Sequence, residues 1–525
     1  MRTVGYNSDI YPTQHMKINR LLILCALAAL VAGSACTKKE GGDNRLVILH
    51  TNDTHSAIDP DRHNLGGVAR RDVLIDSVRG ANENVMLIDA GDAVQGSLYY
   101  TLFGGEVERK VMNAMGYDIQ ILGNHEFDKG MDQLAKEWKQ LNANRLSTNY
   151  DFTGSVLDGL FVPAVVKKFG DKTVGFIGIN LDPAGIVTES NYTGVKYIDG
   201  IKAANEQAAK LKKEGADMVI AVTHIGYENE PGYSDMDLAR NSRDIDVIIG
   251  GHSHTVVDPA DKRPGVPTWR VANAAGDTIS VLQTGSSGVN LGEIDIDLDT
   301  KQVSAKLIPV DSRLDSRVGS KIESIVAPYR AKVDSMRSQV IGNSPFEFER
   351  KSTEMLNLLS DFVRVRGAEL CGKPVDLAIM NKGGIRNSLA SGPITQGEII
   401  DIAPFDNSIV VMDIKGQDLL DNFAVMASQD GNGVSGNVSV LYDPSTKQVN
   451  SATIDGKPVD PNRTYRLATI DYLAAGNDYM EPLKKGVTIA KSPEVLYTIL
   501  IDYISAGKLD TLLGAPDKKP RMTAF

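Results

Sequence analysis

The sequence predicts an α/β protein with two globular domains joined by a helix. In the first half of the chain, short apolar runs that suit buried strands alternate with segments of helical spacing such as Ile201–Glu214. The chain has 525 residues, which exceeds one typical domain and calls for at least two hydrophobic cores. We therefore expect a larger domain at residues 45–315 and a smaller α/β domain at residues 342–525.

The strands of the first domain are predicted from apolar runs too short to be core helices. The six runs are Leu46–Leu49, Val85–Ile88, Ile119–Leu122, Val174–Ile179, Met218–Val222 and Val247–Ile249. Two further strands are expected at Ile279–Gln283 and Glu293–Leu298, the second because its apolar residues alternate.

A connecting helix is predicted at residues 316–341, where apolar residues follow helical spacing. These residues are Ile322, Ile325, Val326, Tyr329, Val333, Met336 and Val340. Pro328 falls within the pattern, so the helix is expected either to bend there or to begin nearby.

The first 35 residues have the pattern of a signal peptide. Two basic residues precede the apolar run Leu21–Ala32, which is too short to span a bilayer. Small residues then lead to Cys36, as in a bacterial lipobox. We expect Cys36 to be lipidated and residues 36–44 to tether the protein to a membrane of the bacterial cell envelope, on its periplasmic or its surface side. A simple secretory signal is the alternative.

Composition argues against one class of protein and excludes another. The chain carries 56 basic and 67 acidic residues, a net charge of -11, which opposes binding of a nucleic-acid polymer but permits a small phosphorylated ligand. It has only 3 cysteines, two of them in the N-terminal segment, so a disulfide framework is excluded.

Side chains that can bind metals stand at the ends of five predicted strands. They are Asp53 and His55, Asp92, Asn124, His224, and His252 with His254. Because the carboxyl ends of strands in an α/β sheet meet at one crevice, these side chains are expected to converge. Three of the motifs are weak signals alone, since Asp-x-His, for example, is more often a turn than a ligand pair. The segments Gly123–Glu126 and Gly250–His254 are unusual. Five motifs in order predict a metal centre.

The mixture of carboxylate, amide and imidazole ligands suits divalent first-row metals such as zinc, manganese or iron. Two such ions about 3.5–4 Å apart can activate water and clamp a phosphoryl group during hydrolysis.

The order of these motifs is similar to that of the calcineurin-like metallophosphoesterases. The segment Gly123–Asp128, followed by a long C-terminal domain, resembles the 5′-nucleotidase/UDP-sugar hydrolase family in particular. The resemblance implies an N-terminal metallophosphoesterase β-sandwich flanked by helices and a C-terminal domain that binds a nucleotide.

The resemblance also implies roles for individual residues. One divalent cation, zinc, manganese or similar, would be held by Asp53, His55 and His254. A second would be held by Asn124, His224 and His252, with Asp92 bridging the two. His125 would be the catalytic histidine and Asp128 would orient it. Asp128 is also a candidate N-cap for a helix at residues 129–141.

In the second domain, Asn381–Arg386 resembles the family's substrate loop. The resemblance assigns Asn381, Gly383 and Arg386 to substrate binding, with Arg386 as the phosphate ligand. Phe405 and Tyr479 would stack on a base, although either ring has a core position as its alternative. Glu354 stands about where the family usually has an arginine, so the phosphate site is expected to be weaker or built differently.

The expected function is hydrolysis of 5′-nucleotides to nucleoside and phosphate outside the cytoplasm, by water activated at two metals, in nucleotide catabolism. A UDP-sugar hydrolase and a 2′,3′-cyclic nucleotide phosphodiesterase are alternatives with the same chemistry. A non-catalytic, nucleotide-binding surface lipoprotein is the alternative from another class. Nothing in the sequence indicates an oligomeric state.

Overall fold

The computed structural model describes residues 44–525, nearly all of a compact unit that spans residues 43–525. The expected signal peptide, Cys36 and all but the last residue of the tether lie outside the described residues. Among residues 44–525, no helix has both the length and the apolar character needed to cross a bilayer.

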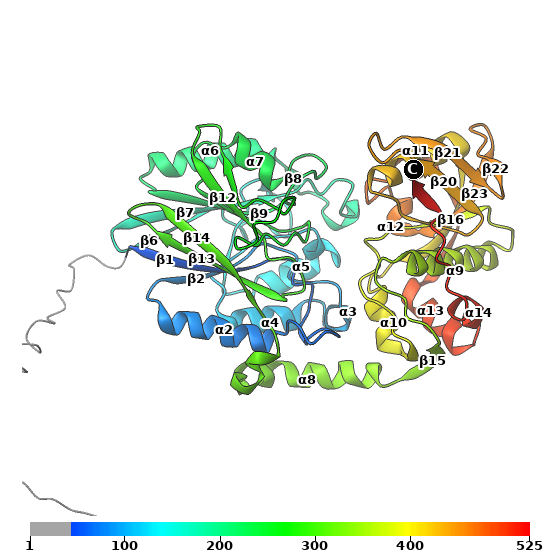
Figure 1. Ribbon diagram of the computed structural model, residues 1–525, viewed down its shortest axis with the longest axis horizontal. Helices are drawn as coiled ribbons and strands as arrows, with labels where there is room; N and C mark the ends of the chain where they lie inside the picture. Colours follow the sequence, from blue (N-terminus) through cyan, green and yellow to red (C-terminus); the bar gives the residue numbers. More distant parts are fainter. Residues whose placement is uncertain (1–43) are drawn as a thin grey trace, which may run out of the picture. The chain divides into compact units, whose positions relative to one another are not determined.

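Two six-stranded sheets form the first domain (Figure 1). The first sheet runs β14 (Gln302–Pro309), β13 (Asn290–Asp297), β1 (Arg45–Thr51), β2 (Val85–Asp89), β3 (Ile119–Gln120) and β4 (Asn144–Arg145). The second runs β11 (Arg270–Ala272), β12 (Thr278–Leu282), β10 (Val247–Ile249), β9 (Met218–His224), β7 (Lys172–Asn180) and β6 (Ala164–Phe169). A separate short pair joins β5 (Tyr150–Asp151) to β8 (Lys196–Tyr197).

The two sheets face each other across one apolar core, which makes a β-sandwich. This core takes Ile48 and Ile88 from the first sheet and Phe176, Ile220 and Ile249 from the second. The outer face of the second sheet packs on α6 (Gly200–Lys213) and α7 (Asp235–Asn241). The outer face of the first sheet belongs to a separate hydrophobic cluster, which it shares with three helices. These helices are α2 (Val68–Ala81), α3 (Leu98–Phe103) and α4 (Glu106–Met115). The predicted α/β class and the sandwich implied by the resemblance are confirmed.

Each predicted strand of the first domain is present, and the central ones are parallel. β1 pairs with β2, and β9 pairs with β7 and β10, all in parallel register. Their carboxyl ends therefore lie at the same edge of each sheet. The run at residues 119–122 pairs only over Ile119–Gln120, so the chain leaves the sheet two residues earlier than predicted.

The connecting helix, α8 (Ser320–Arg337), is shorter than the predicted range 316–341. A 3-10 turn at Ser312–Arg317 precedes it, and the helix continues through Pro328. Val340, predicted as a helical core position, instead begins β15 (Val340–Ser344) and is 63% exposed. β15 pairs with β17 (Gly392–Thr395), which explains why the helix ends before it.

The second domain contains a five-stranded mixed sheet and a four-stranded sheet. The five strands are β19 (Gly433–Val434), β16 (Leu377–Met380), β23 (Thr464–Ile470), β18 (Ser408–Lys415) and β24 (Val487–Val495). The four strands are β22 (Lys457–Pro458), β21 (Val449–Ile454), β20 (Val438–Tyr442) and β25 (Met522–Ala524). The helices are α9 (Thr353–Cys371), α10 (Gln396–Ile402), α11 (Gly416–Ser428), α12 (Asp471–Ala474), α13 (Leu496–Ser505) and α14 (Asp510–Leu513).

Candidate metal centre and substrate cavity

The strand ends bring all seven expected ligand residues to one edge of the first domain. Loops after β1, β2, β3 and β10 carry six of them, and His224 is the last residue of β9. Backbone hydrogen bonds join the first two loops: the amide of Asp53 donates to Gly91 O at 2.9 Å and that of His55 to Asp92 O at 3.0 Å. The two loops are therefore fixed to each other by backbone hydrogen bonds.

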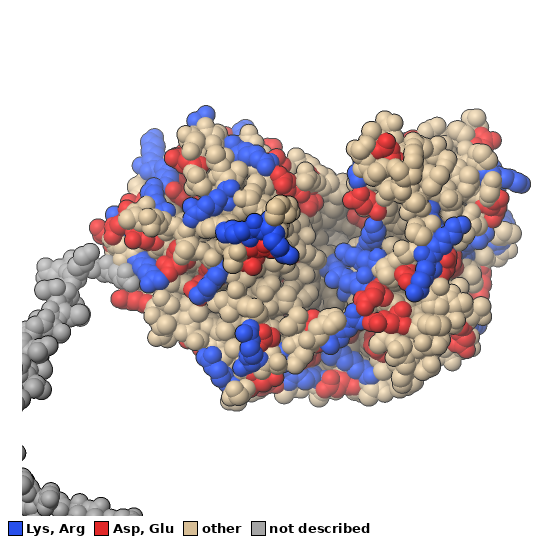
Figure 2. Space-filling model, in the orientation of Figure 1, with Lys and Arg blue, Asp and Glu red and all other residues tan. Residues whose placement is uncertain are grey.

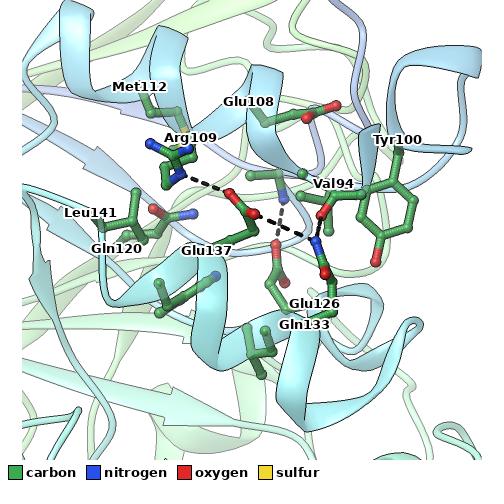
Figure 3. Close-up of a pocket in the computed structure, with 15 residues that line it drawn as sticks. Val94, Tyr100, Glu108, Arg109, Met112, Gln120, Glu126, Gln133, Glu137 and Leu141 are labelled. Carbon is green, nitrogen blue, oxygen red and sulfur yellow. Dashed lines mark hydrogen bonds and ion pairs between the residues drawn. The ribbon is translucent and has the colours of Figure 1, made fainter. Parts of the chain in front are cut away.

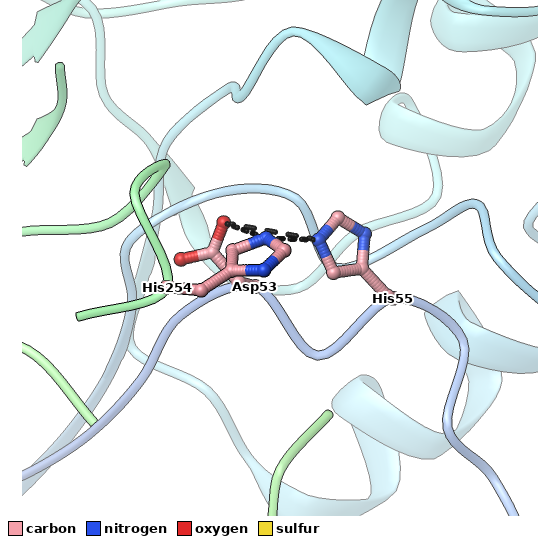
Figure 4. A group of neighbouring side chains, drawn as sticks. All are labelled: Asp53, His55 and His254. Carbon is pink, nitrogen blue, oxygen red and sulfur yellow. Dashed lines mark hydrogen bonds and ion pairs between the residues drawn. The ribbon is translucent and has the colours of Figure 1, made fainter. Parts of the chain in front are cut away.

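Asp53, His55 and His254 form one candidate metal-binding group (Figure 4). The Nε2 atoms of the two histidines lie 2.8 Å apart, and His254 Nε2 is 3.5 Å from Asp53 Oδ1. Burial and nearby Arg386 lower the pKa of His254 to about 2 and hold that of His55 well below its usual value. Both rings are therefore neutral at physiological pH, which is the form that binds a metal.

Asp92, His224 and His252 form a second group. His224 Nε2 lies 3.2 Å from Asp92 Oδ2, and His252 Nδ1 lies 2.9 Å from Asn124 Oδ1. His224 is fully buried; its Nδ1 faces Ala90 O at 2.7 Å, whereas its Nε2 has no hydrogen-bond partner. A backbone acceptor on one ring nitrogen directs the lone pair of the other inward, as metal-binding histidines require.

The charges around His224 also suit a cation. Burial lowers the pKa of its imidazole, but the carboxylates of Asp92 and Asp53 outweigh burial and raise it to about 10. These carboxylates thus stabilise positive charge at this point, which a divalent ion would supply. Asp92 is also grouped with His55 and His125, so it faces both ligand groups. The donor set fits two ions with Asp92 between them.

His125 and Asp128 form a pair beside the ligand groups. Their Nδ1 and Oδ2 atoms are 2.8 Å apart. Burial lowers the pKa of His125, and Asp128 and Asp92 more than reverse this effect and raise it. The alternative role of Asp128 as a helix N-cap is wrong, because α5 (Gly130–Trp138) is preceded by Lys129 at the N-cap position and has no side-chain cap.

Two buried residues that sequence reasoning did not assign to the site support the ligand loops. Glu126 accepts hydrogen bonds from three backbone amides, those of Asp92 at 3.1 Å, Ala93 at 2.9 Å and Gly123 at 2.5 Å. Asn52 donates to Asp53 Oδ2 at 2.6 Å and accepts from the amide of Thr284 at 2.8 Å. Glu126 lies within the segment Gly123–Asp128 and Asn52 directly precedes Asp53, and these positions were the one sequence signal available for the two residues.

Gln283 supports the last ligand loop in the same way. Its Nε2 donates to Asp235 Oδ2 at 2.8 Å and to Gly251 O at 3.1 Å, and its Oε1 accepts from Ser253 Oγ at 3.2 Å. Ser253 stands between the ligands His252 and His254, so Gln283 holds the turn that carries both. No feature of the sequence pointed to Gln283.

The ligand residues themselves have an uncommon backbone. Five of the seven adopt positive φ, the left-handed region that side chains disfavour. They are Asp53 at 49°, His55 at 47°, Asp92 at 53°, His252 at 82° and His254 at 57°. Such strain persists only where surrounding contacts impose it, and it is typical of functional sites.

A small cavity of about 30 Å³ lies behind Glu126 (Figure 3). Its wall includes three acidic side chains, Glu108, Glu126 and Glu137, and the last is paired with Arg109 at 2.7 Å. Burial raises the pKa of Glu108 to about 7. This cavity belongs to the interior that supports the metal loops.

A larger cavity of about 610 Å³ opens in front of the ligand groups. Its wall contains His125 and Asp128 from the first domain and Asn381, Gly383 and Arg386 from the second. The guanidinium Nη2 of Arg386 lies 3.0 Å from Nδ1 of His55 and 3.4 Å from Nε2 of His125. Arg386 therefore reaches across the cavity to a residue of the first candidate metal-binding group and to His125. On the face shown in Figure 2, the surface is hollowed into a groove, and Lys and Arg side chains gather along one side of this groove.

The two expected stacking rings lie differently with respect to the cavity. Phe405 lines the cavity, and its ring centre is 5.8 Å from that of His125. Tyr479 is not among the lining residues; its amide donates to Gly185 O at 3.1 Å and its ring packs beside Gly185. The second aromatic residue of the wall is Tyr472, whose hydroxyl donates to Ile186 O at 2.7 Å.

The cationic part of the wall also differs from expectation. Glu354 lies in the first turn of α9, 3.9 Å from Lys518, and does not line the cavity. Just before this helix, Lys351 is a cation of the wall that sequence reasoning missed. Its neighbour Arg350 does not line the cavity, and Arg350 Nε donates to Ile385 O at 3.2 Å. Burial and neighbouring Arg386 lower the pKa of Arg350 to about 10, and burial and Arg350 lower that of Lys351 to about 8. Positive charges held this close together favour an anionic ligand.

Comparisons with known proteins agree with this geometry. A family model described as calcineurin-like phosphoesterase matches residues 46–256, and one described as 5′-nucleotidase, C-terminal domain matches residues 334–485. The chain is 27% identical over 93% of its length to the 5′-nucleotidase of Homo sapiens, of which it covers 92%. It is 29% identical over 82% of its length to the trifunctional nucleotide phosphoesterase YfkN of Bacillus subtilis, of which it spans only 32%. The crystal structure of a 5′-nucleotidase precursor from Thermus thermophilus superposes with a TM-score of 0.80 at 27% identity, covering 92% of this chain and 99% of that one.

Proposed function

Because the chain belongs to the metal-dependent phosphoester hydrolases that join a calcineurin-like phosphoesterase domain to a 5′-nucleotidase C-terminal domain, we propose that it hydrolyses 5′-nucleotides to nucleoside and phosphate. One observation carries the choice of substrate. Arg386, Phe405 and Tyr472 line the same cavity as His125 and therefore offer sites for a phosphate and a flat base together.

We assign one divalent cation to Asp53, His55 and His254 and a second to Asn124, His224 and His252, with Asp92 shared. Zinc and manganese both suit this set of nitrogen and oxygen donors. When bound, two such cations make hydroxide available near neutral pH and neutralise charge on the phosphoryl oxygens.

The remaining residues bind the substrate and complete proton transfer. Arg386 donates hydrogen bonds to the phosphoryl oxygens. His125 keeps Nδ1 on Asp128 and presents Nε2 to the cavity, where it can donate a proton to the departing ribose oxygen. Asp478, which accepts from Asn381 Nδ2 at 2.9 Å, stands in the wall where it can accept from ribose hydroxyls.

Arg350 and Lys351 favour a second candidate within the same chemistry. Beside Arg386 they add positive charge beyond that needed for a single phosphate. A nucleotide sugar, with two linked phosphates, would use this charge. The further alternative of a non-catalytic nucleotide-binding lipoprotein has no observation in its favour, because both His125 and Asp92 are present and in place.

The proposed setting is the bacterial cell envelope, with Cys36 as the lipid anchor. It is supported by the sequence of the N-terminal segment alone.

One assay tests the substrate. The chain from residue 37 onward, loaded with manganese or zinc, is incubated separately with AMP, UDP-glucose and 2′,3′-cyclic AMP, and the products are separated by chromatography. We expect adenosine and phosphate from AMP at the highest kcat/KM, and loss of that activity after chelation. A higher kcat/KM for UDP-glucose would favour the second candidate. Failure to hydrolyse any of the three esters in the presence of metal would refute the proposal.

A further inference from the structure

Gln95 is a buried cavity residue to which no role has been given so far. It lies three residues after Asp92 and lines the large cavity, yet only 3% of its surface is exposed. Its φ of 70° is in the left-handed region, as in the ligand residues. Gly96, next in the chain, lies so close to the His55 backbone that an added Cβ would be 3.2 Å from His55 O. Gln95 is therefore held by the same packed loops that hold the ligands.

The hydrogen bonds of the Gln95 side chain distinguish its amide oxygen, Oε1, from its amide nitrogen, Nε2. The backbone amide of Gly96 donates at 2.7 Å to one end, which must be the oxygen, Oε1. The other end, Nε2, donates to Asp128 Oδ2 at 2.9 Å. A flipped amide would place two donors face to face at Gly96, so this orientation is fixed.

Asp128 Oδ2 thus accepts two hydrogen bonds, from Gln95 Nε2 at 2.9 Å and from His125 Nδ1 at 2.8 Å. The two donors restrict rotation of the carboxylate. Because Asp128 in turn sets the plane of the His125 ring, a carboxylate free to rotate would let Nε2 drift from its place 3.4 Å from Arg386 Nη2. We propose that Gln95 is a positioning residue for hydrolysis: it fixes Asp128, and through Asp128 it orients His125.

This inference rests on the proposed function, since His125 acts on a substrate only within it. A direct contact between Gln95 and substrate is the competing role. Both ends of the amide are already bonded within the protein, and the oxygen has the shorter of the two bonds. The positioning role therefore engages both Oε1 and Nε2, and a direct contact with substrate could use only the second N–H of Nε2.

The test is a double-mutant cycle with Gln95→Met and Asp128→Asn. Methionine keeps the length of glutamine and removes both hydrogen bonds. With AMP as substrate, we expect Gln95→Met to lower kcat by about 10- to 100-fold, as for other residues that orient catalytic groups, and to change KM by less than about twofold. In the Asp128→Asn background the same substitution should change kcat by less than about twofold, because the residue through which Gln95 acts is already altered.

A matched control is Gln133→Met in α5. Gln133 loses a comparable bond, from its Nε2 to Gly104 O at 2.8 Å, but does not line the large cavity. We expect it to leave kcat unchanged in both backgrounds. If Gln95→Met fails to fold, Gln95→Glu replaces it: the retained oxygen accepts from Gly96, and the second oxygen repels Asp128, so kcat should again fall with KM nearly constant.

Three results would overturn the inference. They are an equal loss of kcat in both backgrounds, a change confined to KM, and a loss of bound metal that accounts for the loss of rate. Failure of the proposed function gives a different result, namely a wild-type chain that does not hydrolyse AMP. The cycle is then measured with p-nitrophenyl phosphate, and the same pattern of kcat values decides the role of Gln95.

Discussion

Replacing Glu126 by glutamine is expected to loosen the metal centre without touching a ligand. The carboxylate accepts three backbone hydrogen bonds, two from the loop of Asp92 and one from Gly123, which precedes Asn124. Glutamine has the same shape but only one acceptor oxygen. Its NH₂ group would face a backbone N–H, and at least one buried donor would lose its partner.

The expected size of the effect follows from these bonds. A hydrogen bond to a charged group contributes about 1.5–3 kcal/mol, and a buried donor left without a partner costs about 1–3 kcal/mol. Glu126→Gln should therefore lower the free energy of unfolding of the first domain by about 3–5 kcal/mol. Metal affinity should fall by about 10- to 100-fold, as for other residues that orient ligands.

Tryptophan fluorescence during urea denaturation measures the loss of stability, because both tryptophans of the chain, Trp138 and Trp269, lie in the first domain. Metal content after dialysis against a chelator measures the loss of affinity. Glu206→Gln on the exposed face of α6 is the control and should change stability by less than about 0.5 kcal/mol. A Glu126→Gln variant that matched this control and kept its metal would refute the reasoning.

Four further outcomes are expected. Phe405→Ala and Tyr472→Ala should each raise KM for AMP about tenfold or more but spare p-nitrophenyl phosphate, and equal effects on both esters would argue against base stacking. Arg386→Ala should lower kcat/KM by about 10- to 100-fold for every phosphate ester tested, because it contacts the phosphate that all of them share. Burial raises the pKa of Glu108 from 4.5 to about 7, so this residue makes the folded protein less stable as the pH rises between these values, by at most about 3 kcal/mol. Glu108→Gln should then gain stability relative to wild type from about pH 5 to about pH 8 in urea denaturation, and a constant difference would contradict the shift. Cys36→Ser should release the protein from the membrane fraction, and unchanged sedimentation would count against the anchor.

The convergence of the candidate metal ligands could be predicted from sequence because strand order decides where they lie. Parallel strands place their following residues at one edge, so Asp53, Asp92 and Asn124 had to approach one another once β1, β2 and β3 were recognised. The pairing of His125 with Asp128 was implied by the resemblance, and the 3-10 turn at His125–Phe127 brings the two side chains together.

The substrate residues were harder to predict, because their directions depend on loop conformation. Tyr472 lies in α12 and Tyr479 in the loop that follows this helix, and nothing in the sequence says which ring faces the cavity. Positive φ at Asp478 and Tyr479, 58° and 59°, turns the chain so that Tyr479 meets Gly185. The hydrogen bonds from Gln95 to Asp128 and from Gln283 to the His252 turn could likewise not be predicted, because each joins residues that are distant in the sequence.

The left-handed backbone at five of the seven ligands restricts how this centre can evolve. Aspartate, asparagine and histidine tolerate that conformation better than other side chains, and a β-branched or bulky replacement would add about 1–2 kcal/mol at each position. Random exchange of ligands is therefore a poor route to a new metal preference in this lineage. Selection for a different ion would act first on neighbours in ordinary backbone conformations, such as Asn52 and Gln283. Substitutions there can change the electrostatic field at a ligand and the direction of its side chain while the ligand's backbone stays as it is.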